Sequence, residues 1–403
     1  MSPVEAARDG LLLVANVGPP VIGGISSYVT NLAEAVRSEF DVRVLTYPAG
    51  LVYLEARGRR NPIRFLFHGL FVLGGVFAVL RMRARHPRLV VHSHSAAFCL
   101  LVAVAGKALG ATAVHTLHSP PRGPSWILRR LGPTLDAVAF VSPALRDLYV
   151  MTTGIGNDRV DILPGAVPAV TPEGRDSREA LRHDLALELG LPPNAFIVLF
   201  LGRVVEDKGV HVLARATARL PGPGIRVLVV GPSGPAPTDV EYLKGISALA
   251  GPDPTRFHVL GAVPSKRLAE LLRIADVLVV PSLWPEPAPV VVAEAFAHGV
   301  PVIASEIGGL PFLVPPEAGL LVPAGDDAAL ANALEALVKD PDQRARLSRG
   351  ALAQARRRHS PEAFAEAHRR FYGRVRTGPT AGARAPGPVS LDVRPDRERG
   401  IIK

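Results

Sequence analysis

Short apolar runs alternate with longer amphipathic stretches along most of this chain, and this alternation limits the possible folds more than any other feature. Apolar runs of this length are typical of strands buried on both faces, and the intervening stretches of about 10 to 20 residues are typical of helices. Many repeats of a strand followed by a helix predict parallel sheets covered by helices. We therefore expect an α/β fold.

The alternation occurs in two series, which predict two doubly wound, Rossmann-like domains. In the first series we expect strands at Leu11–Val17, Val42–Thr46, Leu89–His92, Ala113–Thr116, Ala137–Val141 and Val160–Leu163. In the second we expect strands at Phe196–Leu201, Arg226–Val230, Phe257–Leu260, Val277–Val280 and Val302–Ala304. A polar, Pro-containing segment from Pro164 to Glu173 separates them.

The expected domain boundaries follow from these series in a chain of 403 residues. The first domain is expected at 1–168, a linker segment at 169–194 and the second domain at 195–358. A final helix at 359–376 is expected to cross back to the first domain. Residues 377–403, in which Gly, Pro, Arg and Asp follow no period, are expected to form a disordered tail.

The composition excludes several classes of protein. Hydrophobic residues make up 48% of the chain and charged residues 20%, which excludes global disorder. A single cysteine, Cys99, excludes an internal disulfide and a zinc site with three or four thiolates. The first ten residues include Glu5 and Asp9, and the apolar run that follows is short, so we expect no signal peptide. We expect a cytoplasmic protein, with the inner face of the membrane as a second possible location.

The net charge of +10 is unevenly distributed. The stretch 56–135 contains no Asp or Glu but has twelve cationic residues: Arg57, Arg59, Arg60, Arg64, Arg81, Arg83, Arg85, Arg88, Lys107, Arg122, Arg129 and Arg130. A basic protein can bind nucleic acid, an anionic membrane or an anionic substrate. We expect this stretch to form a basic face that meets an anionic membrane or an anionic, lipid-linked acceptor.

The segment Phe65–Leu80 is strongly apolar but shorter than the roughly 20 residues that span a bilayer. Three interpretations remain open for it. The favoured one is a long helix packed on a sheet. The others are a helix lying on a membrane surface, with flanking arginines at the headgroups, and a transmembrane span.

Several motifs of common chemistries are missing, and two that occur have ordinary explanations. The sequence contains no GxxxxGK[ST], HExxH or GxSxG motif. Asp340-Pro341-Asp342 spells DxD but is expected to cap a helix, with Pro341 in its first turn. His92 and His94 end a predicted strand and point the same way, as metal ligands can, but no third ligand at a suitable spacing is evident.

Glycines and cations follow the first strand of each predicted domain. Gly23 and Gly24 lie between the first strand and a helix, where glycine allows the backbone to approach a phosphate. Arg203 and Lys208 lie after the first strand of the second domain, where they can converge on an anion or form an exposed charged turn.

Two glutamates, separated by seven residues, follow a later strand of the second domain. Glu286 lies in a Pro-rich loop, and Glu294 lies within an apolar helix. A carboxylate in apolar surroundings is costly unless something pairs with it or hydrogen-bonds to it. A hydroxyl-rich ligand would satisfy this requirement.

These motifs together resemble the family 4 retaining glycosyltransferases of the GT-B fold. The resemblance covers nearly the whole chain before the tail. Its most specific element is the Glu, seven residues, Glu pattern at Glu286 and Glu294, which continues into 298–305 and 308–311 in the family's order. Gly202-Arg203 with Lys208-Gly209, and Gly23-Gly24 before a helix, agree with it.

The resemblance implies a role for each site residue. Arg203 and Lys208 would neutralise the diphosphate of a nucleotide-sugar donor, a UDP- or GDP-sugar, so that neither metal nor cofactor is required. Glu294 would accept hydrogen bonds from the ribose, and Glu286 from the transferred sugar. His118, after a first-domain strand, would bind the donor sugar near the reacting carbon, although a lone histidine is more often structural. The remaining donor-binding residues would be Gly23, Gly24, Gly231, Gly261, Pro287, Ala288, Pro289 and Val290.

The resemblance also divides the work between the domains and leaves alternatives. The second domain would hold the donor, and the first domain would hold a sugar, glycan or lipid-linked acceptor, so nucleic acid is not expected as a partner. Pro289 stands where many family members have Gly, and it lacks an N–H that could contact the donor. An inactive GT-B subunit that serves another transferase is the main alternative. A phosphorylase or a sugar-nucleotide epimerase is the second.

Overall fold

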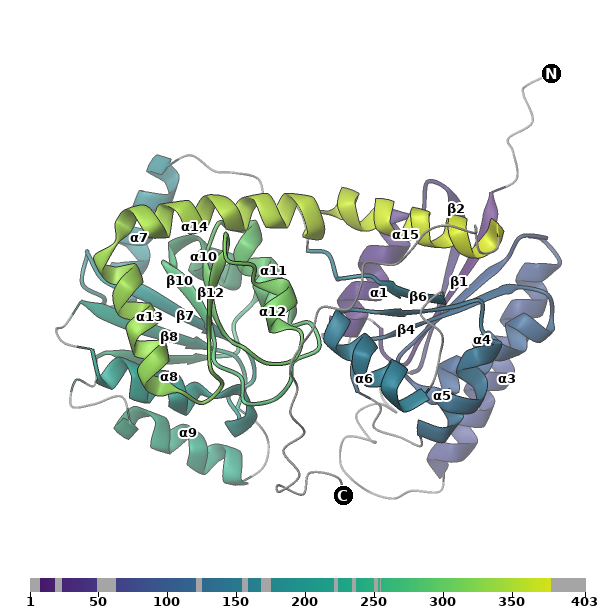
Figure 1. The fold of residues 1–403 in the computed structure, drawn as a ribbon, viewed down its shortest axis with the longest axis horizontal. Coiled ribbons are helices and arrows are strands. Elements are labelled where there is room, and N and C mark those ends of the chain that lie inside the picture. Colours follow the sequence, from purple (N-terminus) through teal and green to yellow (C-terminus); the bar gives the residue numbers. More distant parts are fainter. Residues whose placement is uncertain are drawn as a thin grey trace.

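The protein is described here from a computed structural model that covers residues 8–18, 24–48, 63–120, 125–153, 159–167, 175–220, 224–233, 237–249, 253 and 255–377. In this part of the chain two six-stranded parallel sheets form the centres of two α/β domains (Figure 1). The expected α/β fold with two doubly wound domains is confirmed.

The first sheet has the strand order β2-β1-β3-β4-β5-β6. Its strands are β1 (Asp9–Ala15), β2 (Phe40–Thr46), β3 (Val90–His94), β4 (Thr112–Leu117), β5 (Ala137–Phe140) and β6 (Val160–Ile162). The chain winds outward from β1 to β2 and then continues on the other side of β1 with β3. Ligands of open α/β sheets bind at the carboxyl ends of the two strands where the winding reverses, here β1 and β3.

The second sheet has the order β12-β11-β10-β7-β8-β9. Its strands are β7 (Phe196–Leu201), β8 (Ile225–Val230), β9 (Phe257–Gly261), β10 (Val277–Val280), β11 (Val302–Ser305) and β12 (Gly319–Val322). The winding reverses between β7 and β10, which are neighbours in the sheet. The same rule therefore points to the residues that follow these two strands.

Helices cover both faces of each sheet (Figure 1). In the first domain they are α1 (Gly24–Ala35), α3 (Ile63–Arg83), α4 (Ala97–Ala108), α5 (Ser125–Leu131), the short η1 (Gly132–Thr134) and α6 (Pro143–Thr153). In the second they are α7 (Arg175–Leu189), η3 (Glu206–Lys208), α8 (Val210–Ala218), α9 (Pro237–Leu249), α10 (Ser265–Ile274), α11 (Val290–Ala297), α12 (Leu310–Leu313), α13 (Asp327–Lys339), α14 (Pro341–Gln354) and η4 (Ala355–His359). The last described helix is α15 (Pro361–Thr377).

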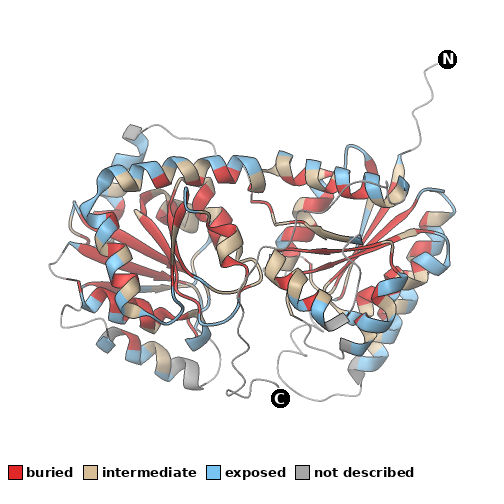
Figure 2. Cartoon of the chain, viewed as in Figure 1, coloured by how far each residue is buried: buried red, intermediate tan, exposed pale blue. Residues whose placement is uncertain are grey.

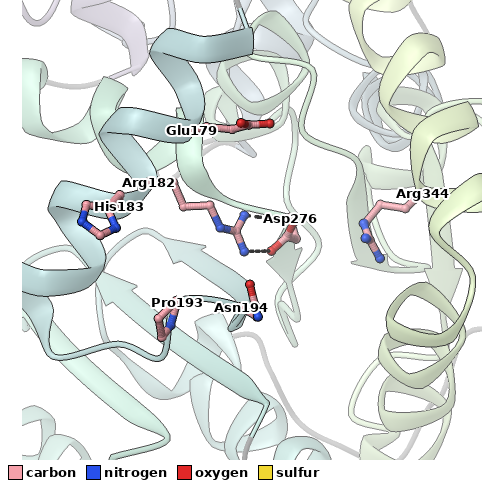
Figure 3. A pocket seen from close by; sticks show the side chains of 7 residues that line it. All are labelled: Glu179, Arg182, His183, Pro193, Asn194, Asp276 and Arg344. Atoms are coloured by element: carbon pink, nitrogen blue, oxygen red, sulfur yellow. Dashed lines mark hydrogen bonds and ion pairs between the residues drawn. The ribbon is translucent and has the colours of Figure 1, made fainter.

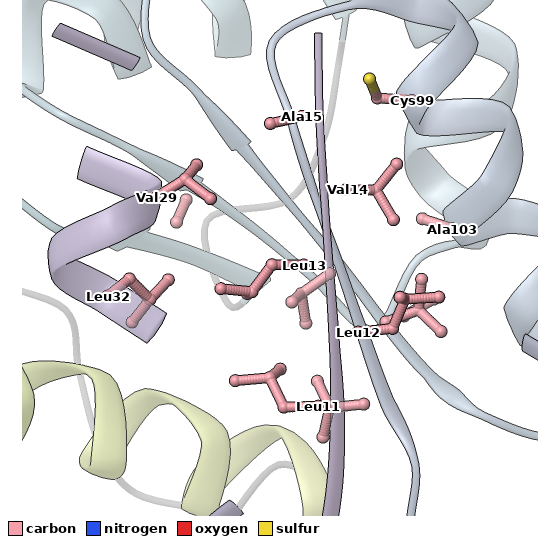
Figure 4. Packing of buried hydrophobic residues seen from close by; sticks show 14 of the residues in the cluster. Leu11, Leu12, Leu13, Val14, Ala15, Val29, Leu32, Cys99 and Ala103 are labelled. Atoms are coloured by element: carbon pink, nitrogen blue, oxygen red, sulfur yellow. The ribbon is translucent and has the colours of Figure 1, made fainter. Parts of the chain in front are cut away.

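Burial on both faces explains why the central strands are continuous apolar runs. In β1, Leu13 points toward Val29 of α1, while Val14 points toward Cys99 of α4 on the opposite face (Figure 4). In β7 the even-numbered and odd-numbered residues belong to two different cores, one on each face of the sheet. The strands accordingly form the buried centre of each domain (Figure 2).

The final helix α15 packs on the first domain although it follows the second domain in sequence (Figure 1). Phe364, Phe371 and Tyr372 are buried in the core of the first domain. The hydroxyl of Tyr28 on α1 lies 2.9 Å from Nε2 of His368. The chain therefore passes from the second domain back to the first at η4, where α14 ends.

The structure differs from the sequence-based expectations at two places. The range 169–194, expected as a linker, contains α7, whose Leu185 belongs to a core of the second domain because the helix has an apolar face. Strand β12 was not predicted, since its apolar run is short and lies close to prolines. The expected tail lies outside the described residues from position 378 onward.

Candidate active site

Lys208 and Glu286 meet at the point where the winding of the second sheet reverses. Lys208 lies in η3, which follows β7, and Glu286 lies in the loop that follows β10. The ammonium group of Lys208 donates to Oε1 of Glu286, and the hydroxyl of Ser282 donates to the same oxygen at 2.9 Å. Two residues predicted to bind the donor are thus brought into direct contact.

The Glu286 carboxylate needs these partners because its side chain is only 8% exposed. A buried carboxylate without an opposite charge and hydrogen bonds is strongly unfavourable. The backbone of this loop is also fixed, since the amide of Gly309 donates to the carbonyl oxygen of Glu286 at 2.6 Å. The carboxylate is therefore held in one place by bonds to its side chain and its backbone.

Gly209 explains how the chain can turn so tightly after Lys208. Its φ of 70° lies in the left-handed region, and a Cβ at this position would lie 1.9 Å from the carbonyl oxygen of Pro281. Only glycine avoids both the conformational strain and the clash. This close approach of the two backbones places Lys208 beside the Glu286 loop.

Glu294 lies in α11 with most of its side chain withdrawn from solvent. Burial raises the pKa of its carboxyl above the usual range. In the described part of the chain this carboxylate has no hydrogen-bond or ion-pair partner. A desolvated acid without a protein partner is a typical feature of ligand-binding sites.

Two other residues of the second domain that were expected to bind the donor, Arg203 and Gly231, form no hydrogen bond or ion pair with the Lys208–Glu286 pair. Arg203 is exposed and forms no ion pair with any described residue, so the structure does not bring it to Glu286. A Cβ at Gly231 would lie 1.9 Å from the carbonyl oxygen of Gly202, and the amide of Gly231 donates to Gly261 at 2.8 Å. Close backbone packing therefore accounts for Gly231 by itself, and its place beside a nucleotide base stays a prediction.

His118 follows β4 in the first domain and belongs to a cluster of aromatic rings. Its Nε2 lies 3.0 Å from Nδ1 of His94, and its ring packs edge-on against Tyr28. Desolvation, followed by the nearby His115 and His368, lowers the pKa of His118 to about 3, although part of the residue still reaches solvent. His118 is therefore a neutral imidazole at physiological pH, suited to hydrogen bonding.

The structure gives His92 and His94 structural partners. Nδ1 of His92 lies 2.7 Å from the hydroxyl of Tyr372, and Nε2 of His92 lies 2.7 Å from the hydroxyl of Thr116. Among the described residues no group of three or more His, Cys, Asp or Glu side chains could hold a metal ion. Sequence reasoning did not connect His94 with His118. The pairing of β3 with β4, which aligns His94 with Thr116, is the signal that could have shown it.

Residues near the expected donor site also form contacts between the two domains. A Cβ added at Gly24, the first residue of α1, would lie 3.7 Å from Val290, the first residue of α11. Ala288 packs against cores of both domains. The carbonyl oxygen of Pro287 lies close to Gly309, and Pro289 precedes α11. Gly23 lies outside the described residues.

A separate hollow of about 430 Å³ lies at the amino ends of the central strands of the second sheet, and Figure 3 shows the residues that line it. Arg182 bonds there to both carboxylate oxygens of Asp276, at 3.0 and 3.3 Å, and Asp276 also accepts the amide of Ile197. These bonds tie α7 to the amino ends of the strands. The charged residues Arg182 and Asp276 that line the hollow therefore have structural roles, and the hollow is separate from the candidate donor site.

Asp340 and Pro341 behave as the capping interpretation predicts. The carboxylate of Asp340 accepts the amide of Gln343 at 2.8 Å, and Pro341 opens α14. This bonding accounts for the first acid of the Asp340-Pro341-Asp342 motif without a metal.

Two family models match the sequence, one for each domain. The family described as "Glycosyltransferase Family 4" matches residues 22–169. The family described as "Glycosyl transferases group 1" matches residues 184–354. The two matches together include every predicted site residue.

Several curated and solved proteins are similar to this chain. A D-inositol 3-phosphate glycosyltransferase from Acidothermus cellulolyticus is 36% identical over 84% of this chain and 82% of that protein. An alpha-maltose-1-phosphate synthase from Mycolicibacterium smegmatis is 30% identical over 81% of this chain and 88% of that protein. The solved structure of Anabaena HepE in complex with UDP has a TM-score of 0.71 at 21% identity, covering 90% of this chain and 99% of that one.

The structural likeness supports the fold, and the sequence likeness supports the chemistry. Both predicted domains have a matching family, and relatives at 30% identity or more extend over most of the chain. The resemblance inferred from the motifs is therefore confirmed: this chain is a glycosyltransferase that belongs to family 4 and has the GT-B fold.

Proposed function

We propose that this enzyme transfers a sugar from a nucleotide-diphosphate sugar, a UDP- or GDP-sugar, to an acceptor held by the first domain. The transfer retains the anomeric configuration and needs neither metal nor cofactor. The observation that carries the proposal is the contact of Lys208 with Glu286 at the reversal point of the second sheet, with the unpartnered acid Glu294 on the helix that follows.

Lys208 and Glu286 would bind the donor on either side of the bond that breaks, Lys208 at the diphosphate and Glu286 at the transferred sugar. A diphosphate entering the site gives the Lys208 ammonium a second anionic partner, and Arg203 lies exposed on the same loop to add a second positive charge. Positive charge placed where the leaving diphosphate develops charge lowers the barrier to its departure. The Glu286 carboxylate accepts a hydrogen bond from a hydroxyl of the transferred sugar.

Glu294 and His118 complete the proposed donor site. The Glu294 carboxylate accepts hydrogen bonds from the ribose hydroxyls. These hydrogen bonds replace those that water would make to an exposed carboxylate. The neutral imidazole of His118 hydrogen-bonds the donor sugar without adding a positive charge beside the reacting carbon. Gly24 brings the first domain's backbone close to α11, where the donor lies.

The names of similar proteins support a nucleotide donor and an anionic acceptor. HepE was solved with UDP and with UDP-glucose, and the name of the Acidothermus relative specifies D-inositol 3-phosphate. For this chain we propose a sugar, glycan or lipid-linked acceptor that carries negative charge, because the first domain is rich in arginine. With Cys99 as its single cysteine, we place the enzyme in the reducing cytoplasm or on the inner face of the membrane.

A donor panel tests this proposal. UDP-, GDP- and ADP-sugars are each incubated with the enzyme, and both donor hydrolysis and the shift in thermal unfolding temperature are measured. One nucleotide class should stabilise the protein and be hydrolysed. Stabilisation without any hydrolysis or transfer would favour the inactive-subunit alternative, and no response to any donor would contradict the proposal.

A further inference from the structure

Helix α3 is apolar on two opposite faces. One face is buried, and its large residues Phe71, Val79 and Met82 belong to the first domain's core. The other face is exposed. Its large residues, with their exposed fractions, are Phe65 (65%), Leu66 (62%), Leu70 (53%), Leu73 (66%), Phe77 (65%) and Leu80 (50%). An exposed face of this kind needs a partner, since soluble surfaces rarely leave such residues together.

The exposed residues form one continuous stripe along the helix. From Leu66 to Leu80 they follow one another at intervals of three or four residues, the spacing that keeps side chains on one face. No charged residue interrupts this face before Arg81. The stripe therefore runs for about four turns of α3 without a polar break.

Neighbouring helices extend the same surface. Helix α4 packs against both α3 and α5, and the three helices lie along one face of the first sheet (Figure 1). Leu101 on α4 is 39% exposed, and Trp126 on α5 is 63% exposed. Tryptophan is favoured where an apolar region meets water, because its ring is apolar and its N–H is polar. We call these outward residues of α3, α4 and α5 the apolar face.

The charged residues on α3, α4 and α5 themselves are all cationic. The exposed arginines on and next to these helices are Arg81 at the end of α3, Arg85 and Arg88 between α3 and β3, and Arg129 and Arg130 on α5. The whole stretch 56–135 has no acid. Such a surface is complementary to an anionic one. A second copy of this chain would instead place arginines against arginines, with no carboxylate in the stretch to pair with them.

A transmembrane span does not fit these contacts, although α3 is long and apolar enough to cross a membrane by length and composition. The buried side of α3 packs on α4 and β1. At Gly75 the helices are so close that a Cβ would lie 2.6 Å from Val102. Insertion across a bilayer would remove α3 from the core, whereas a position in the plane of the surface keeps every one of these contacts.

We propose that the apolar face of α3, α4 and α5 docks on an anionic phospholipid bilayer, with α3 lying in the plane of the membrane. The α3 stripe enters the boundary between headgroups and acyl chains, and the arginines bind the headgroup phosphates. The proposal does not depend on the donor assignment. It gives the first domain direct access to an acceptor that is embedded in the membrane.

Vesicle co-sedimentation tests the docking. The full chain should sediment with vesicles of phosphatidylglycerol and phosphatidylcholine, less with phosphatidylcholine alone, and less as salt is added. The triple variant Leu70→Gln, Leu73→Gln, Phe77→Gln should bind at least about tenfold more weakly, because it removes the central apolar residues. The matched control is Leu187→Gln on α7, a residue 71% exposed outside the apolar face, which should bind like the unmodified chain.

Two further readouts keep the test decisive if the triple variant folds poorly. In a Trp284→Phe background, emission from Trp126 should be quenched by brominated lipid, and an absence of quenching would contradict the proposed orientation. Analytical ultracentrifugation then tests the alternative occupant. A dimer that the triple variant dissociates, together with no binding to anionic vesicles, would overturn the proposal in favour of a second copy.

Discussion

The ammonium group of Lys208 lies against the carboxylate of Glu286, although the two residues are 78 positions apart in the chain. Each follows one of the two strands between which the second sheet reverses its winding. The contact therefore depends on the topology of the whole domain and not on local sequence. A diphosphate bound as we propose would therefore meet a lysine that already has an anionic partner in Glu286.

Gly209→Ala tests the close approach that places Lys208. Alanine at this position would strain a left-handed backbone and collide with the carbonyl oxygen of Pro281. We expect a loss of roughly 1 to 3 kcal/mol in the free energy of unfolding, together with reduced donor turnover. Chemical denaturation measures the first effect. Gly190→Ala is the matched control, since it is also left-handed but has open space around it. An equal loss in both variants would show that backbone strain, and not the contact with Pro281, sets the cost.

Glu294→Gln separates binding from stability. Burial raises the pKa of this carboxyl, so its ionised form is unfavourable in the folded protein. The neutral amide should therefore increase the free energy of unfolding at neutral pH, by up to about 1 kcal/mol, while weakening donor binding. The gain should shrink as the pH falls, because the native acid becomes protonated. Thermal unfolding with and without the donor measures both effects, and a variant that loses stability without donor would contradict this account.

The buried histidines predict acid sensitivity. The pKa of His115 and that of His368 are lowered to about 4, mainly by burial. Below the ordinary pKa near 6.5 the unfolded chain binds protons that the folded chain does not. The free energy of unfolding therefore decreases as the pH is lowered. We expect each to contribute a loss of roughly 1 to 2 kcal/mol between pH 7 and pH 5.

A matched pair of variants isolates this contribution. His115→Gln should flatten the pH dependence of the unfolding free energy by about one histidine's share, whereas His183→Gln, at an exposed position, should leave it unchanged. Equal slopes in all three proteins would show that His115 is not held neutral by the fold.

His94 is expected to position His118. Their ring nitrogens lie 3.0 Å apart, and the pKa of His94 is also lowered by burial, so one neutral ring donates to the other. His94→Ala should lower kcat by about tenfold or more with little change in KM, because a misoriented ring still allows the donor to bind. His94→Asn, which can keep a hydrogen bond, should recover part of the rate. A change confined to KM would instead indicate that His94 contacts the substrate.

The strands and the second-domain motifs could be predicted from sequence because each depends on local chemistry. Apolar runs such as Phe196–Leu201 are buried on both faces, and the spacing of Glu286 and Glu294 carries a family pattern. The capping role of Asp340 was also readable, since it depends on residues within one turn.

The exposure of α3 and the partners of the histidines could not be predicted in the same way. Periodicity finds a buried face only when the opposite face is polar, and in α3 both faces are apolar. The partner of His92 is Tyr372, which lies 280 positions away and reaches it only because α15 returns to the first domain. Such contacts depend on how distant segments pack.

Donor turnover in variants of the ion pair tests the central claim most directly. We expect Lys208→Ala and Glu286→Ala to remain folded but to lose about a hundredfold or more in kcat with the donor that the panel identifies. The control is Lys339→Ala, which removes a lysine from an exposed ion pair with Glu335 and should keep full turnover. Unchanged turnover in Lys208→Ala and Glu286→Ala would contradict the assignment of this site.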